Sequence, residues 1–307
     1  MKPFFSVVIS IYNKEKFIVQ TLESVLAQTF TDFEIIIVND GSTDNSLKLI
    51  QNFQDARLTI IDQQNSGASV ARNNGMAAAK GVFIALLDGD DIWDPDFLKY
   101  IHEATVVHPD KCVFTTALAH LYDGKIIPVT YSFKSDADTL VLDYFKSSQQ
   151  HTILSGSTAV FKKEILKTTG VFDRQIASGQ DTDFWIRIGL HYPIVFINKV
   201  LVFYVYNRES LSNTTTNLSL KPKFDKYYDE ENTNKYLKLF LDRNRFSLAI
   251  LSKLNDDTAS YNYYRNALSK KNLSLKHQIL IDAPKWLLKM LLKIKSASGK
   301  KAYHVAS

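Results

Sequence analysis

The first hundred residues alternate short runs of aliphatic side chains with amphipathic stretches, and this alternation constrains the fold more than any other feature. The apolar runs cover residues 6–12, 33–40, 57–62 and 81–88, and helical patterns follow at 15–28, 43–54, 67–79 and 95–107. Strands that are apolar on both faces, each followed by a helix, indicate a mostly parallel sheet covered by helices on both sides. The sequence therefore predicts an α/β fold of Rossmann-like type.

The second part of the chain is less regular. Residues 111–122 and 125–133 flank an Asp-Gly pair and predict a hairpin, and a helix is expected at 181–192 between strands at 157–161 and 194–206. Beyond residue 216 the pattern is polar and helical. We therefore expect one domain over residues 1–215, with halves 1–110 and 111–215, and a helical C-terminal extension over residues 216–307.

Polar residues gather where the predicted strands end. Ser10, Ile11 and Tyr12 close the first strand, Asp40 closes the second, and Asp88 closes the fourth. Ligands of open α/β sheets bind at the carboxyl ends of the strands, so these positions are expected to converge on one crevice. A turn that caps the next helix explains residues 41–44 but gives Asp40 no structural reason.

The stretch "LLDGDDIWDPDF" at residues 86–97 carries five aspartates. Asp94 and Asp96 suit the start of the following helix, whereas Asp88 and Asp90 are not needed for capping. Two carboxylates on a tight turn, which Gly89 permits, fit a Mg2+ or Mn2+ ion whose other ligands are water and substrate phosphates. The alternative is a solvated acidic loop that binds nothing.

Two further segments offer charged candidates. Arg72 lies among small residues in the helix predicted at 67–79, and it is either an exposed cation on a close-packed helix or a group that reaches a diphosphate. Asp181 and Asp183 follow a glycine loop, and one of them is expected to cap the next helix. Trp185 is expected in the core.

Composition and missing motifs exclude several classes of protein. The chain has no G-x-G-x-x-G, Walker lysine loop or G-x-S-x-G elbow, which argues against common dinucleotide, NTPase and serine hydrolase sites. A single cysteine, Cys112, forms neither an internal disulfide nor a thiolate zinc site, which favours a reducing cytosol. Residues 253–307 hold eleven Lys and Arg against three Asp and Glu, so the main body gives no argument for nucleic-acid binding.

Four segments, in their order and spacing, resemble the family 2 glycosyltransferases of the GT-A fold. They are "FSVVISIYNKEKFIVQTLESVLAQTF", "FEIIIVNDGSTDNS", "NSGASVARNNGMAAAKGVFIALLDGDDIWDPDFL" and "GQDTDFWIRI", within residues 4–212. The resemblance implies a nucleotide-sugar donor and transfer with inversion at the anomeric carbon. It makes residues 1–110 the nucleotide-binding half and residues 111–215 the acceptor half.

The resemblance also implies roles on the nucleotide side. Ser10 and Tyr12 would flank the base, and Asp40 would bond it, with uracil as the expected base. Ile11, between the first two, belongs to the same nucleotide-binding set. Arg72 would lie near the nucleotide.

The metal and catalytic positions follow in the same way. Asp88, with Gly89, would approach the ribose or the metal, and Asp90 would hold a Mn2+ or Mg2+ cofactor on the diphosphate. Asp181 takes the place of the family's catalytic base. Glycosyl transfer needs a stabilised leaving diphosphate and an activated hydroxyl, and these residue types suit both needs.

The chain departs from the family pattern at two positions on the acceptor side. Gln180 stands where the family usually has glutamate, and Asn207 stands where many relatives carry a histidine. Together with Asp183 and Trp185, these residues form the set expected to influence acceptor binding.

The expected function is inverting transfer of a sugar from a UDP-sugar to a glycan or lipid-linked acceptor, in surface polysaccharide synthesis on the cytosolic side of a membrane. Two alternatives stay open. One is a nucleotidyl or phosphoryl transferase that uses the same metal crevice, and the other is an inactive module that binds sugar nucleotides.

The C-terminal segment "PKWLLKMLLKIK" at 284–295 forms an amphipathic pattern. Lysines lie along one side of the predicted helix, and the other side carries Trp286, Leu287, Met290, Leu291 and Ile294. Such a helix either lies on an anionic membrane surface or packs its apolar face on the catalytic domain.

Overall fold

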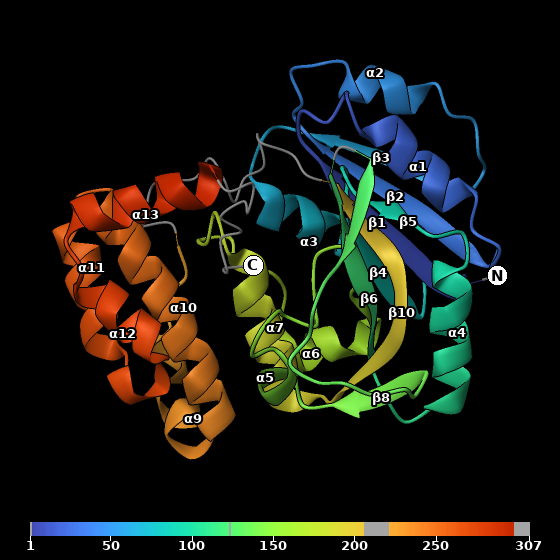
Figure 1. Cartoon of the computed structure of the whole chain (residues 1–307). Coiled ribbons are helices and arrows are strands. Elements are labelled where there is room, and N and C mark those ends of the chain that lie inside the picture. Colours follow the sequence, from blue (N-terminus) through green and yellow to red (C-terminus); the bar gives the residue numbers. More distant parts are fainter. Residues whose placement is uncertain (1, 123, 206–220, 298–307) are drawn as a thin grey trace. The chain divides into compact units, whose positions relative to one another are not determined.

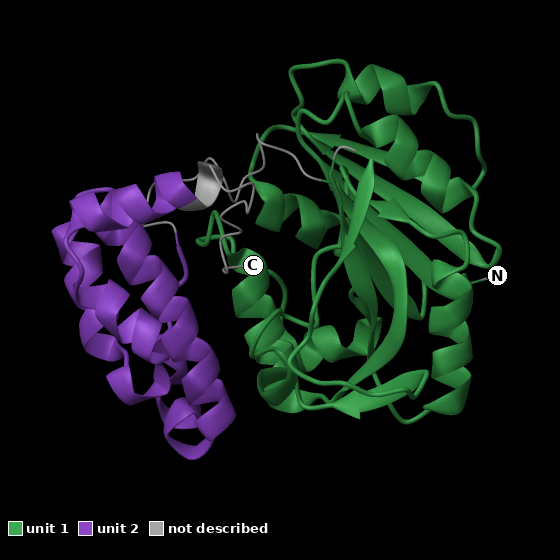
Figure 2. Ribbon diagram, in the orientation of Figure 1, with its two compact units in different colours: residues 1–210 green, residues 211–307 purple. Residues whose placement is uncertain are grey.

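The structure, a computed structural model, describes residues 2–122, 124–205 and 221–297. The chain divides into two compact units, residues 1–210 and residues 211–307 (Figure 2). Unit 1 is an α/β fold around one sheet, and unit 2 is made of helices. The predicted boundary between residues 215 and 216 lies outside the described residues.

Four parallel strands open unit 1 (Figure 1). They are β1 (Phe5–Ile11), β2 (Phe33–Asp40), β3 (Leu58–Gln63) and β4 (Phe83–Asp88). Strand β1 pairs with β2 and β4, and β2 pairs with β3. The connecting helices are α1 (Ile18–Leu26), α2 (Ser46–Gln51) and α3 (Ala68–Ala78). The predicted α/β alternation is confirmed, and the four strands end at one edge of the sheet.

The rest of unit 1 extends this sheet with strands of both directions. The order is β3-β2-β1-β4-β9-β6-β10-β5, with β7 beside β6 and β8 beside β10. Strand β9 (Val160–Lys162) runs antiparallel to β4 and β6, whereas β10 (Ile194–Val205) runs parallel to β6 (Val113–Tyr122). The remaining elements are β5 (Ile92–Trp93), α4 (Phe97–Val107), β7 (Lys125–Pro128), β8 (Thr139–Leu142), α5 (Tyr144–Ser147), the 3-10 helix η1 (Lys163–Ile165), α6 (Leu166–Thr169) and α7 (Gln180–His191).

Local details differ from the sequence predictions, and several elements are shorter than predicted. The predicted hairpin is present, because β6 and β7 pair antiparallel with Tyr122 opposite Lys125. Helix α4, however, begins two residues later than predicted, since the Asp94 side chain accepts a hydrogen bond from the Asp96 amide (3.0 Å) in a turn before the helix. Strand β5 was not predicted, because two residues are too few for a periodic pattern.

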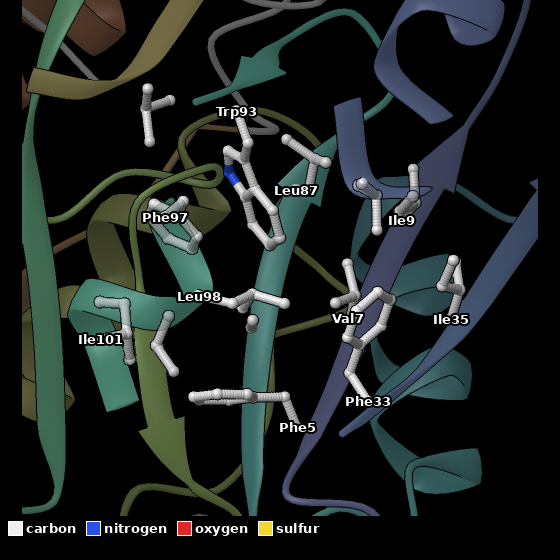
Figure 3. Close-up of a cluster of buried hydrophobic side chains, with 14 of the residues drawn as sticks. Phe5, Val7, Ile9, Phe33, Ile35, Leu87, Trp93, Phe97, Leu98 and Ile101 are labelled. Carbon is white, nitrogen blue, oxygen red and sulfur yellow. The ribbon is translucent and has the colours of Figure 1, made fainter. Parts of the chain in front are cut away.

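One apolar core fixes α1, α2 and α4 against the sheet. Figure 3 shows the part of it between the first strands and α4. Alternate residues of β1, namely Phe5, Val7, Ile9 and Ile11, lie in this core and are fully buried. Trp93 joins them and stacks on Phe97, with the ring centroids 4.1 Å apart. The turn after β4 is therefore anchored to the core within a few residues of its aspartates.

Helix α3 covers the opposite face of the sheet at very short range. Successive side chains of a strand point to opposite faces, and Val8 and Val38 point toward α3. A Cβ atom built on Gly75 would lie 2.4 Å from Val8 Cγ1 and 3.2 Å from Val38 Cγ2. The absent side chain lets the helix approach the strands, and Arg72 lies one turn earlier, toward the carboxyl edge of the sheet.

Unit 2 is built around a long helix, α10 (Lys235–Leu254). It packs against α9 (Tyr228–Thr233), α11 (Thr258–Ala267), α12 (Leu275–Asp282) and α13 (Lys285–Ala297), with 3-10 helices η3 (Asp225–Tyr227) and η4 (Lys270–Asn272) between them. The Arg245 guanidinium donates to both carboxylate oxygens of Glu231, at 2.6 and 3.2 Å. The predicted C-terminal helices are confirmed. Among the described residues, no helix combines the length and apolar character needed to cross a bilayer.

The Gly75→Ala substitution tests the close approach of α3. Overpacking of this kind costs roughly 1–3 kcal/mol, while alanine gains about 1 kcal/mol in helix propensity over glycine. We expect a net loss of stability, measured as a lower midpoint of urea unfolding. The control, Ala77→Ser on the exposed side of the same helix, should change the midpoint little. An unchanged or higher midpoint for Gly75→Ala would contradict the packing described here.

Candidate active site

The end of β1 lies beside the acidic turn that follows β4. In the sheet register Ser10 pairs with Asp88, and Ile11 pairs with Asn39 on the other side. Ile11 is buried in the core, whereas Tyr12 is 46% exposed. Of the three residues predicted to bind the nucleotide in this segment, Tyr12 is therefore the one with an accessible ring, and Ile11 contributes core packing.

Asp40 is buried and already has several partners. Its carboxylate accepts hydrogen bonds from the Gln63 side chain (2.7 Å), the Ser66 amide (2.8 Å) and the Gly67 amide (2.9 Å). These bonds hold the loop that leads into α3. This structural role could not be predicted from local patterns, because Asp40 and the loop are more than twenty residues apart.

Arg72 is a buried cation at the centre of the site. Its Nη2 donates to Asp88 Oδ1 at 2.5 Å, and its guanidinium lies over the Phe172 ring, 5.4 Å from the centroid. The Nη1 atom is buried and has no hydrogen-bond partner among the residues that the structure describes. A buried guanidinium with an unused donor is an arrangement that suits an anionic ligand.

The charges of three aspartates act on Arg72. Burial alone lowers the pKa of Arg72, yet Asp88 first, and then Asp181 and Asp90, hold this pKa above its ordinary value. Asp181 shows the other side of this coupling. Burial raises the pKa of its carboxyl group, the Arg72 charge opposes the rise, and Asp88 adds to it. The structure thus brings together Arg72 of α3, the turn that carries Asp88 and Asp90, and Asp181 of α7.

The turn at Asp88 to Asp91 is tightly packed. A Cβ atom on Gly89 would lie 2.6 Å from Ile11 Cγ2, so the predicted need for glycine there comes from close packing on β1. The Asp90 carboxylate forms an ion pair with Lys14, and both side chains are largely shielded from solvent. Sequence reasoning missed Lys14, although a cation directly after the first strand was a visible signal.

Asp91 is a second residue that sequence reasoning missed. It is buried, and its carboxylate accepts hydrogen bonds from Ser157 Oγ (2.5 Å) and from the Val205 amide (3.1 Å). Ser157 Oγ also accepts a bond from the Asp88 amide (3.1 Å). Burial first, and then the charges of Asp90 and Asp88, raise the pKa of Asp91 well above its ordinary value. Asp91 therefore ties the acidic turn to the segment before β9 and to the end of β10.

The start of α7 separates the two aspartates that the sequence left as alternatives. Neither of them caps the helix: the N-cap residue is Gly179, with a φ of 81° and no side-chain bond. Asp183 is fully buried and pairs with Arg187 at 3.1 Å on the same helix, which is a structural role. Asp181 is only half-buried, and its Oδ1 accepts a bond from the Thr182 amide at 2.9 Å.

The other acceptor-side candidates have different surroundings. Gln180 is 5% exposed, and its Oε1 atom has no hydrogen-bond partner among the described residues. Trp185 is buried beside Phe172 and Phe184, as expected for a core residue. Asn207 lies outside the described residues.

The donor set of the acidic turn fits a divalent ion only in part. Asp88 and Asp90 offer carboxylate oxygens, which in this structure pair with Arg72 and Lys14. The described ranges contain no group of three His, Cys, Asp or Glu side chains arranged to hold a metal. A Mg2+ or Mn2+ ion with one or two carboxylates and substrate phosphates is compatible with such a site.

Comparison with known proteins decides the family. Residues 6–170 match the sequence model described as Glycosyl transferase family 2, which is more than half of the chain. The chain belongs to glycosyl transferase family 2.

Chondroitin synthase of Escherichia coli is 29% identical over 213 residues, which are 68% of this chain and 30% of that protein. EpsJ of Bacillus subtilis, an uncharacterized glycosyltransferase, is 45% identical over 93 residues, or 30% of this chain and 27% of that protein. The chain thus spans about a third or less of these two relatives.

Solved structures agree on the fold. Staphylococcus aureus TarS residues 1–349, in complex with UDP-GlcNAc, superposes with a TM-score of 0.70 at 20% identity, covering 98% of this chain and 93% of that one. Another TarS structure gives a TM-score of 0.65 at 22% identity, covering 88% of this chain and 50% of that one. The predicted GT-A fold is confirmed.

Proposed function

We propose that this glycosyltransferase moves a sugar from a UDP-sugar, with inversion, to a glycan or lipid-linked acceptor in surface polysaccharide synthesis on the cytosolic side of a membrane. Two likenesses support the choice of donor and pathway: the fold shared with a TarS structure that holds UDP-GlcNAc, and the sequence similarity to a chondroitin synthase. One observation carries the proposal, namely that buried Arg72 pairs with Asp88 of the acidic turn while the charge of Asp181 in α7 acts on the same guanidinium.

Arg72 suits the diphosphate of the nucleotide-sugar because one of its N–H groups is not used in a hydrogen bond within the described part of the chain. A guanidinium recognises phosphate oxygens through several N–H groups at once, and the buried Nη1 of Arg72 is one such group without a partner among the described residues. Asp88 and Asp90 would hold the divalent ion, which when bound acts as a Lewis acid that stabilises the departing diphosphate. Tyr12, which is exposed at the end of β1, supplies a ring against which the base can stack.

Asp181 suits the role of general base. Its carboxylate is half-buried, and its raised pKa makes it a stronger base than an ordinary aspartate. In the proposed reaction, Asp181 takes the proton from an acceptor hydroxyl as the oxygen attacks the anomeric carbon and the bond to the diphosphate breaks. Such a base typically contributes about 10²–10⁴-fold to the rate.

Product analysis separates this proposal from its two rivals. The full chain, supplied with UDP-sugars, Mn2+ and an acceptor mixture, should release UDP and form a glycoside of inverted configuration. Release of a nucleoside monophosphate or of pyrophosphate would favour nucleotidyl or phosphoryl transfer. Binding of the donor without either transfer or donor hydrolysis would favour an inactive binding module.

The Asp181→Asn variant tests the base. We expect transfer to fall by at least about 10²-fold, with UDP affinity nearly unchanged. In the wild type, transfer should decline on the acid side at a higher pH than an ordinary aspartate would give, because the raised pKa protonates the carboxylate sooner. Activity comparable to that of the wild type would place the base elsewhere.

Stability provides an internal control for the same variant. An aspartate whose folded-state pKa is raised costs stability once the pH exceeds its unfolded pKa, and the cost grows until the pH passes the folded pKa. Asp181→Asn should therefore unfold at the same or a higher temperature than the wild type at neutral pH. Asp183→Asn, which breaks the pair with Arg187, should instead lower the unfolding temperature.

The Asp90→Asn variant tests the metal. We expect the affinity for UDP, measured by calorimetry, to stop responding to Mn2+, while circular dichroism shows an intact fold. Asp32→Asn removes the same charge from an exposed side chain before β2, at the opposite edge of the sheet, and should leave the Mn2+ response intact. If UDP binds wild type and variant equally well with and without Mn2+, the metal role is wrong.

We further infer that α13 in unit 2 docks on an anionic membrane surface. The helix packs into unit 2 through Leu288, which is 4% exposed, whereas most of the predicted apolar side is exposed and only its Leu287 is half-buried. Three residues of that side stay exposed at four-residue spacing: Trp286 (67%), Met290 (43%) and Ile294 (57%). Exposed lysines of the same helix lie next to this row, as in helices that lie in the interface plane of a bilayer.

Vesicle flotation tests the membrane surface. The full chain should float with anionic vesicles and be released by salt, because each lysine near such a surface contributes about 1 kcal/mol. The double variant Trp286→Ser, Met290→Ser should stay in solution with an unchanged unfolding temperature. The matched control, Val106→Ser with Val107→Ser, removes two exposed apolar side chains from α4 and should still float. Flotation of both double variants would reject α13 as the docking surface.

A further inference from the structure

Lys14 is fixed near the acidic turn by an interlocked pair of loops. The loop after β1 and the loop after β2 exchange hydrogen bonds: the Asn13 amide donates to Ser42 Oγ (3.0 Å), and the Thr43 amide donates to Asn13 Oδ1 (2.8 Å). The Lys14 amide itself donates to Ser46 Oγ at 2.7 Å. Because its backbone is held in this way, the position of the Lys14 side chain does not depend on its ion pair alone.

The partner of Lys14 is the carboxylate that would hold the metal. The Nζ atom pairs with Asp90 Oδ2, with 17% of the Lys14 side chain and 12% of the Asp90 side chain exposed. A pair so shielded is screened less than a surface pair and must be broken before another cation can take its place. Arg72 holds Asp88 in a similar way.

The balance of charge decides when this exchange is favourable. Lys14 pairs with Asp90 and Arg72 pairs with Asp88, so the negative charge of the turn is largely neutralised. A divalent ion alone therefore gains little electrostatic free energy there. The Lys14 ammonium group that it displaces is also left close to other positive charge. A nucleoside diphosphate changes this balance because it brings several negative charges. It can accept hydrogen bonds from the released ammonium group while the ion occupies the carboxylate.

We propose that Lys14 is a resident counter-ion of Asp90 that yields this carboxylate to the divalent ion and then pairs with the donor diphosphate. The proposal deepens the proposed function and rests on it for the identity of the diphosphate. The proposal makes metal and nucleotide binding mutually dependent. The ion releases Lys14 for the diphosphate, and the diphosphate brings the negative charge that makes this release favourable.

The test compares Lys14→Met with Lys16→Met in the full chain. Lys16 lies two residues further along the same loop and is exposed, so this control removes the same charge without touching Asp90. Free Mn2+ is measured by its paramagnetic resonance signal, first with protein alone and then with UDP. Calorimetry gives the affinity for UDP at saturating Mn2+, and circular dichroism confirms the fold.

Without nucleotide, Lys14→Met should bind Mn2+ about threefold to tenfold more tightly than the wild type and Lys16→Met. With saturating Mn2+, it should bind UDP more weakly by a similar factor, so the coupling between the ligands falls. Equal Mn2+ affinity in all three proteins would overturn the counter-ion role, and unchanged UDP affinity would overturn the pairing with the diphosphate.

Should Lys14→Met not fold, Lys14→Gln serves the same comparison. If no protein binds UDP, the donor assignment fails, while the metal-only measurement still decides whether Lys14 competes at Asp90.

Discussion

The arrangement of the site depends on one buried cation. Arg72 pairs with Asp88 at 2.5 Å, and the charges of Asp181 and Asp90 also act on it. A guanidinium buried to this degree is stable only with compensating charge, so the strand end and the start of α7 are held around it. The same requirement explains the close approach of α3 at Gly75, because a helix further from the sheet could not place Arg72 there.

This arrangement divides the carboxylates into groups with different tasks. Asp183 and Asp91 are fixed by partners within the fold, Arg187 for the first and Ser157 with Val205 for the second. Asp181 stays partly exposed to solvent, and its carboxylate accepts a hydrogen bond from the Thr182 amide. Aspartates that look alike in the sequence are thereby separated by their surroundings into two residues held by partners within the fold and one that stays partly exposed.

Sequence reasoning predicted the alternation of strands and helices because periodicity depends on local patterns, and it placed Asp88, Asp90 and Arg72 at the correct edge. It failed where a role depends on partners distant in the chain. Asp40 binds the loop at Ser66 and Gly67, and Asp91 binds Val205, which no local pattern indicates. The start of α7 was misjudged for a related reason, since the N-cap residue is Gly179 and neither Asp181 nor Asp183 caps the helix.

The interlocked loops after β1 and β2 have a consequence for protein engineering. Asn13 and Ser42 each satisfy a backbone or side-chain group of the other loop, and Glu15 accepts a further bond from the Asn45 amide at 3.0 Å. A graft that exchanges one of these loops for that of a relative leaves unpaired donors on the other. The two loops should therefore be transplanted together, and chimeras that cross between them should express poorly even when each parent folds well.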